Sequence, residues 1–264
     1  MAQETILRLS IFLVLFTALA VLELIIPKRS ERPMRWHRWA TNLSLVFIDQ
    51  LAIRLWAILI PLLAIGAAVD ATNMGWGLFN LLALPHWLEA FLAILALDFA
   101  IWTQHLVSHK VPLLWRFHKV HHADKDMDVT TALRFHPFEI AASMVLKIGV
   151  IYLIGPAAWT VLVFEILLSA TAMFTHANIA LAPWLDQNLR KVIVTPDMHR
   201  IHHAPERSDH DSNYGFFLAV WDRVFATYRV KTSSLNALEV GLIWPKEKAA
   251  KLTFALFLPF FRQK

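Results

Sequence analysis

The sequence contains no cysteine and carries few charges. The absence of cysteine from its 264 residues excludes disulfide bonds, thiolate metal ligands and cysteine-ligated iron–sulfur clusters in this chain. Only 17% of the residues are charged, whereas 57% are hydrophobic. This composition is too apolar for an ordinary soluble domain and indicates a helical protein that crosses a membrane several times.

The small excess of positive charge fits a membrane surface better than a nucleic acid. The net charge is +5, and the basic residues flank apolar segments. Residues 9–26 have the length of a membrane span. A signal peptide is the alternative, because Ala18-Leu19-Ala20 resembles a cleavage site, although the chain start lacks the usual positive charge. The basic loop that follows is expected to be cytoplasmic; it contains Lys28, Arg29, Arg32, Arg35 and Arg38.

Further apolar segments predict the rest of the membrane topology. Those expected to cross or enter the membrane are 43–69 with a kink at Pro61, 87–108, 138–154 and 157–175. The last two are joined by Gly155-Pro156, which predicts a helical hairpin that dips into the membrane and returns. Residues 78–84 and 253–261 are too short to span and are expected to lie at the interface.

Histidine is concentrated in three clusters. An HxxxH pair comes first, and HxxHH follows twice; the residues are His105, His109, His118, His121, His122, His199, His202 and His203. On an α-helix, residues three or four apart share a face, whereas adjacent residues diverge by about 100°. The two adjacent histidines of each HxxHH can therefore reach two different metal ions.

The number of histidines favours a dinuclear metal site. Imidazole binds iron, zinc, copper and nickel. The clusters supply eight rings and His176 is a ninth candidate, whereas one ion takes at most about six ligands. Chance clustering is the alternative in a chain with 13 histidines, but the repeated spacing argues against it.

Asp98 is a charged residue inside the third expected span. It lies seven residues before His105, two helical turns away on the same face. Ionisable residues within membranes are candidates for function. Asp98 could therefore orient His105 by accepting a hydrogen bond; the alternative is a polar contact between helices.

The order HxxxH, HxxHH, HxxHH on a short membrane chain resembles the fatty acid hydroxylase/sterol desaturase superfamily. Three further segments are similar to it: Thr131–Glu139 (TALRFHPFE), Phe174–Asn178 (FTHAN) and Trp221–Phe225 (WDRVF). The resemblance covers about residues 90–230 and is specific to the superfamily but not to a substrate. Ala226 departs from it, because the family often has glycine there.

This resemblance implies an all-α integral membrane bundle whose cytoplasmic helical cap holds two iron ions, which zinc can replace in purified protein. Such enzymes use O2 and two electrons to hydroxylate or desaturate a lipid. The implied metal ligands are His105, His109, His118, His121, His122, His176, His199, His202 and His203. His136 and Asn178 are expected beside the ligands, with direct ligation as the alternative; His136 precedes Pro137 and can also cap or brace a helix.

The expected activity is O2-dependent hydroxylation of a sterol, an ether lipid or a fatty acyl chain, with desaturation as the alternative. A membrane protein that binds or transports metal is an alternative of another class, but its ligands should lie near mid-membrane. A zinc hydrolase is disfavoured, because catalytic zinc usually takes three protein ligands and the chain has no HExxH.

The expected partners are a lipid, the membrane and a separate electron donor, because the chain carries no fused cytochrome b5-like domain. The donor would be a cytochrome b5-like protein, a ferredoxin or a reductase. Residues 1–85 are expected to form the N-terminal spans, 86–232 the catalytic domain and 233–264 an interfacial tail. A bacterial inner membrane is preferred to the endoplasmic reticulum, with the active site in the cytoplasm.

Overall fold

The computed structural model describes residues 2–30, 34–56, 63–82, 84–231 and 239–261. Within these ranges the chain is helical, and its extended pairings are two isolated bridges, Pro27 with Ile179 and Ile193 with Leu218. The all-α prediction is therefore confirmed for this part of the chain. Arg32 of the basic loop and the kink expected at Pro61 lie outside the described residues.

Four helices are long and apolar enough to cross a membrane. They are α1 (Ala2–Ile25), α5 (His86–Lys110), α7 (Pro137–Ile154) and α8 (Ala158–His176), and they cover the segments predicted over 9–26, 87–108, 138–154 and 157–175. The predicted hairpin is formed by α7 and α8. It turns at Gly155, which has a φ of +63° and bonds back to the Ile151 carbonyl. A Cβ there would lie 2.5 Å from the Trp76 carbonyl oxygen, so the turn requires glycine.

The second span expected over 43–69, with its kink at Pro61, does not match the helices that the structure describes on either side of residues 57–62. Helix α2 (Arg35–Trp56) ends within this range, and α3 (Ala64–Met74) is a separate helix. Helix α2 carries four charged residues, and the 11 residues of α3 extend only about 16 Å. Instead, α3 packs on α7 and α8 through a face of small residues that permits close approach: Ala64, Ala67, Ala68 and Ala71.

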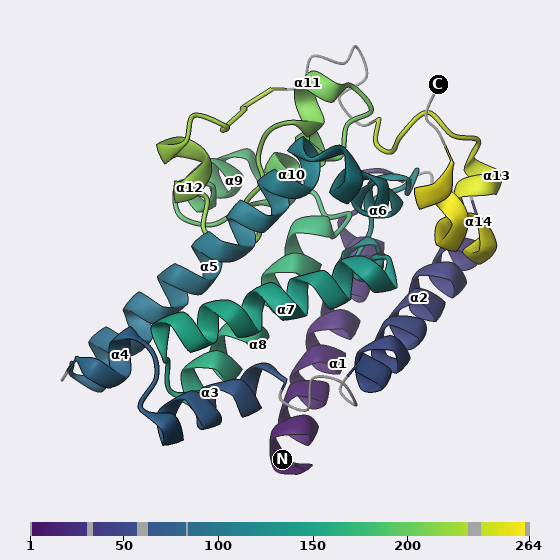
Figure 1. Ribbon diagram of the computed structural model, residues 1–264. Helices are drawn as coiled ribbons and strands as arrows, with labels where there is room; N and C mark the ends of the chain where they lie inside the picture. The colour runs from purple at the N-terminus through teal and green to yellow at the C-terminus, as the bar shows by residue number, and fades with distance from the viewer. Residues whose placement is uncertain (1, 31–33, 57–62, 83, 232–238, 262–264) are drawn as a thin grey trace.

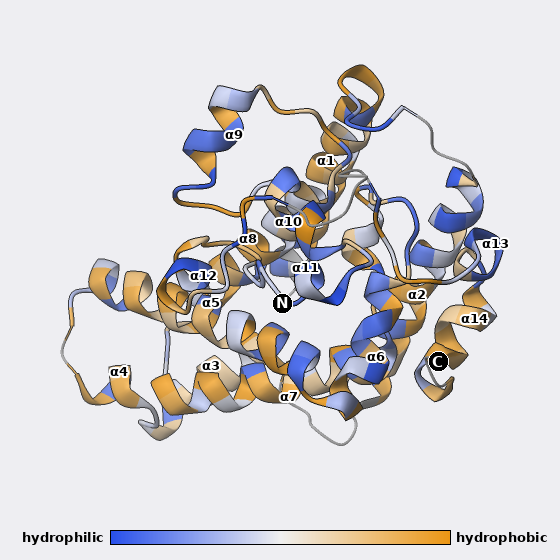
Figure 2. Cartoon of the chain, turned by 90° about the horizontal axis from the view of Figure 1, so that it is seen from above, coloured by the Kyte–Doolittle hydropathy of each residue, from blue (hydrophilic) through white to orange (hydrophobic). Residues whose placement is uncertain are grey.

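The remaining helices are short, and several gather at one end of the long ones (Figure 1). We call this assembly the cap; it comprises α6 (Pro112–His122), α9 (Pro183–Leu189), α10 (Pro196–His202), α11 (Arg207–His210) and α12 (Val220–Val224). Seen from this end, hydrophilic ribbon is concentrated in α6, α10 and α11, whereas α3 and α4 (Leu78–Leu81) are largely hydrophobic (Figure 2). The chain also forms η1 (Thr131–Leu133), α13 (Lys246–Ala249), α14 (Leu252–Phe257) and η2 (Leu258–Phe260).

The described part of the basic loop lies against the cap. Lys28 Nζ is 2.7 Å from Asp197 Oδ2, and Arg29 Nη1 is 3.2 Å from Asp126 Oδ1. The backbone N–H of Lys28 donates to the Asn178 carbonyl, just beyond the end of α8. The positive charges that follow α1 therefore lie at the same end of the molecule as α6 and α10.

A buried ion-pair network joins α2 to the loop after α6. Arg38 donates to both carboxylate oxygens of Asp124, at 2.5 and 2.8 Å, and to Asp128 at 2.9 Å. All three side chains are at most 3% exposed. Removing one partner from such a network leaves buried charge uncompensated, which costs more than the pair itself contributes.

We expect Arg38→Met to destabilise the protein by about 3–5 kcal/mol, because Asp124 and Asp128 would lose their shared cation. The measurement is unfolding in detergent, followed by circular dichroism. Arg116→Met is the matched control, because Arg116 is exposed on α6. Equal midpoints for the two variants would show that the network contributes nothing specific.

Candidate metal centre

The nine imidazoles predicted as ligands lie together in two groups. Within each group, one ring nitrogen of every residue lies within 4.8 Å of those of all the others. All nine residues are at most 3% exposed. The group of five contains His105, His109, His118, His122 and His202, and the group of four contains His121, His176, His199 and His203.

Adjacent histidines belong to different groups. His121 lies in the group of four and His122 in the group of five; His202 lies in the group of five and His203 in the group of four. This is the divergence predicted for neighbouring residues on a helix. Helices α6 and α10 therefore contribute to both groups, whereas α5 contributes only to the group of five and α8 only to the group of four.

The inner nitrogens of several rings face one another closely. His105 Nε2 is 3.0 Å from His118 Nε2, and His176 Nε2 is 3.0 Å from His121 Nε2. Metal–imidazole bonds of about 2.1 Å at right angles would place two nitrogens about 3.0 Å apart. The spacing therefore fits neighbouring ligands of one ion.

The outer nitrogens are held by fixed acceptors. His105 Nδ1 donates to the Tyr214 carbonyl and His202 Nδ1 to the Ser212 carbonyl, each at 2.7 Å. His118 Nδ1 is 2.6 Å from Glu139 Oε1. Because a carbonyl oxygen only accepts, the proton of such a ring lies on Nδ1 and the lone pair on Nε2 points inward. Two lone pairs facing each other repel, and a bound cation between them would relieve this repulsion.

Other ring nitrogens are buried without any hydrogen-bond partner. Both nitrogens of His109 and of His122 are in this state, as are Nε2 of His202 and Nε2 of His203. Unpaired buried polar atoms are costly and call for an explanation. Metal ligation would explain one such nitrogen in each of these four residues, because each residue offers one ligand atom to one of the two groups.

Burial keeps three of the clustered imidazoles neutral. It lowers the pKa of His121, His122 and His203 well below the ordinary histidine value, and neighbouring histidines lower these pKa values further. At neutral pH these rings are therefore unprotonated, which is the form that binds metal. The residues present thus fit a dinuclear centre with nitrogen ligands.

Three residues expected beside the clustered histidines form hydrogen bonds with other partners. Asp98 does not orient His105; its Oδ2 accepts from Trp221 Nε1 at 2.8 Å and from the Leu218 N–H at 3.3 Å. His136 caps α7 by accepting from the Phe138 N–H, which is the alternative kept open for it. The Asn178 side chain bonds to the backbone of Arg29. All three brace the surrounding structure.

Comparison with known proteins agrees with this centre. A family model described as fatty acid hydroxylase matches residues 90–227. The chain belongs to the fatty acid hydroxylase family. This match covers the nine clustered histidines together with Glu139 and Tyr214, which hold two of them.

Individual relatives are distant. The chain is similar to human alkylglycerol monooxygenase (29% identity; 61% of this chain, 35% of the relative), to Rhizobium tropici ornithine lipid hydroxylase OlsE (28%; 54% and 43%) and to human cholesterol 25-hydroxylase (26%; 60% and 56%). It thus matches only about a third to a half of the length of these relatives. No solved structure gives a significant match.

Several residues that hold the clustered histidines were missed by the sequence analysis. Glu139 and Asp222 lie in segments that resemble the family, but the sequence alone assigned no role to either residue. The Asp222 carboxylate accepts from the N–H groups of Tyr214 and Gly215, at 2.8 and 2.9 Å, and so fixes the carbonyl that holds His105.

Arg134 supports a ring of the other group. Its side chain donates three hydrogen bonds, and its carbonyl is 3.3 Å from His121 Nδ1. Because every residue has a backbone carbonyl, the sequence does not show which carbonyls accept from the histidines.

We expect Glu139→Leu to weaken metal binding about 10- to 100-fold, because His118 would lose the acceptor that orients it. Glu139→Gln should have a smaller effect, since its amide oxygen can still accept. The measurement is competition for the bound metal with a chelator of known affinity. Equal losses in both variants would show that hydrogen bonding to His118 is not what matters.

His202→Ala should lower the metal content of the purified protein, because it removes one ring from the group of five. His37→Ala and His86→Ala are the controls, because both histidines are exposed and outside the two groups. Metal per protein is measured by mass spectrometry of the metal. Full occupancy of the His202→Ala protein, or loss of metal from either control, would contradict the assignment.

Proposed function

We propose that this protein is a membrane-bound lipid hydroxylase that holds two iron ions and uses O2 and two electrons from a separate donor. The observation that carries the proposal is the division of nine buried imidazoles into a group of five and a group of four. Imidazole suits iron and zinc alike. The names of the relatives, a monooxygenase and two hydroxylases acting on lipids, favour iron and redox chemistry over zinc hydrolysis.

Bound iron would supply the activation of O2 and the removal of hydrogen from an unactivated C–H bond, which side chains alone cannot perform. The chain would supply the ligands and their orientation. Tyr214, Ser212 and Glu139 hold rings of the group of five from outside, and the Ala172 carbonyl holds His176 of the group of four at 2.7 Å. Burial of all nine rings keeps bulk water from the reacting atoms.

The apolar core of the long helices adjoins both groups. The core between α5, α7 and α8 contains Leu97, Ile101 and Phe164, and Phe216 packs against it. The ring of Phe216 is also 4.8 Å from that of His105 and 6.1 Å from that of His199. A lipid chain that approached along this core would therefore present its C–H bonds to both groups. The substrate class we propose is a sterol, an ether lipid or a fatty acyl lipid.

Two alternatives are less well supported. A desaturase could use the same ligands, but the three relatives are named for adding oxygen. A metal transporter should bind its ion near mid-membrane, whereas α5 and α8 carry their clustered histidines in the C-terminal part of each helix. An enzyme with a fixed centre at one end of the bundle accounts for this placement.

The same placement supports a cytoplasmic active site. Lys28, Arg29 and Arg35 follow the first helix and lie at the end that holds the cap, and basic residues mark the cytoplasmic side. We propose residues 86–232 as the catalytic domain, within which the family match falls. The electron donor would then approach the cap from the cytoplasm.

The test is lipid mass spectrometry of cells grown under 18O2 that express either the wild type or His202→Ala. We expect one lipid to gain a single labelled oxygen atom only with the wild type, which would identify the substrate. A lipid that loses two hydrogens without label would move the assignment to a desaturase. Identical lipids in both strains, with iron bound and a reduced donor supplied, would contradict an oxidative role.

A further inference from the structure

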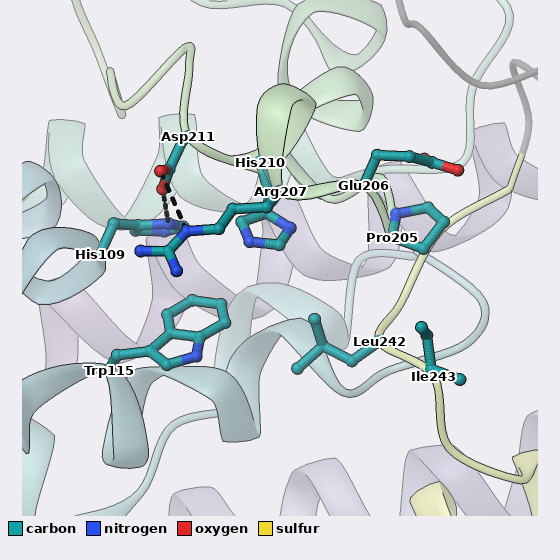
Figure 3. Close-up of a pocket in the computed structure, with 9 residues that line it drawn as sticks. All are labelled: His109, Trp115, Pro205, Glu206, Arg207, His210, Asp211, Leu242 and Ile243. Carbon is teal, nitrogen blue, oxygen red and sulfur yellow. Dashed lines mark hydrogen bonds and ion pairs between the residues drawn. The ribbon is translucent and has the colours of Figure 1, made fainter. Parts of the chain in front are cut away.

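A metal ion needs a route to the histidines, because all nine are at most 3% exposed. A cavity of about 400 Å³ opens in the cap between α5, α6, α11 and the segment that contains Leu242 and Ile243. Figure 3 shows His109 at its wall. Since His109 belongs to the group of five, this cavity reaches a candidate ligand.

The inner end of the cavity is suited to receive an ion. Neither ring nitrogen of His109 has a hydrogen-bond partner, and Asp211 Oδ1 lies 3.6 Å from His109 Nδ1. The Trp115 ring also lines the cavity, 4.9 Å from the ring of His109 and 5.4 Å from that of His122. The rings of His109 and His122 are 4.8 Å apart. An ion that reached His109 would therefore stand beside a second member of the group of five.

The wall also offers metal-binding atoms nearer the surface. Glu206 is exposed and immediately precedes α11. His210 is the last residue of α11, and its ring stacks on that of Trp115 at 5.2 Å. Carboxylate oxygen and imidazole nitrogen both bind divalent iron. Among the described residues, these atoms are not close enough together to form a third group. They fit brief contacts along a path better than a storage site.

Arg207 places a positive charge at this cavity. Its side chain is 75% exposed, and its Nε lies 3.4 Å from Asp211 Oδ2. Figure 3 shows the guanidinium reaching from α11 toward Asp211, beside His109. A cation in this position opposes the approach of a second cation. Because the side chain is long and exposed, it can swing away from the cavity.

We propose that this cavity is the route by which divalent iron is loaded, with Glu206 and His210 as transient ligands and Arg207 as a displaceable electrostatic barrier. The inference rests on the proposed function, because it takes the histidine groups to be the metal centre. It assigns no part in lipid oxidation to Glu206, Arg207 or His210. It predicts opposite effects on loading when the acidic and the basic residue lose their charges.

The experiment measures the rate at which the full-length protein, stripped of metal in detergent, binds Co²⁺. Stopped-flow absorption follows the Co²⁺–imidazole signal, and the final absorbance gives the amount bound. Glu206→Gln should slow loading roughly tenfold, in the range of electrostatic steering. His210→Phe keeps a flat ring against Trp115 but removes both nitrogens, and should also slow it. Arg207→Gln should accelerate loading severalfold.

Two control variants separate the cavity from the overall charge of the cap. Glu247→Gln on α13 and Arg116→Gln on α6 remove matched exposed charges that do not line the cavity, and both should load at the wild-type rate. All variants should reach the wild-type amount of bound Co²⁺, since none removes one of the nine clustered histidines.

Unchanged rates in the three cavity variants, or equal changes in the controls, would overturn this route while leaving the metal centre intact. Wild-type Co²⁺ binding that persists undiminished in His202→Ala would instead contradict the centre itself, and the route with it. The final amount bound therefore tests the proposed function, whereas the rate tests the cavity.

Discussion

The structure depends on holding nine buried imidazoles close together with ring nitrogens turned inward. When a ring points one nitrogen toward a shared centre, an acceptor for the other nitrogen fixes the orientation of the ring. Tyr214, Ser212 and Ala172 supply backbone carbonyls for this purpose, and Glu139 supplies a carboxylate. The long helices α7 and α8 and the loops of the cap therefore determine the geometry of the centre as much as the histidines do.

The N-terminal helices take part in the same support. Arg38 on α2 binds the acidic loop after α6, and Asn42 on the same helix accepts from Arg134, whose carbonyl faces His121. A chain of buried polar contacts thus runs from α2 to one ring of the group of four. Although the family match begins only at residue 90, the preceding segment is part of the framework around the site.

The sequence was sufficient for the parts of this molecule that follow local periodicity. Helical spacing predicted that His121 and His122 would serve different groups, and Gly155-Pro156 predicted the hairpin of α7 and α8. Prediction from hydrophobicity alone was less successful, since the described parts of the span expected over 43–69 belong to the charged α2 and the short α3. The expectation for Asp98 also failed, because the partner of His105 is a backbone carbonyl 109 residues away, and tertiary contacts of that kind have no local pattern.

The sharing of adjacent histidines between the two groups has a consequence for how such a chain can change through evolution. Inserting or deleting one residue within His118–His122 or His199–His203 would turn the following side chains by about 100°, and rings would exchange groups or leave both. Substitutions at the exposed positions of α6 carry no such penalty. Variation in length among descendants of this sequence should therefore accumulate between the motifs, in loops, while the distance between neighbouring histidines stays constant to the residue.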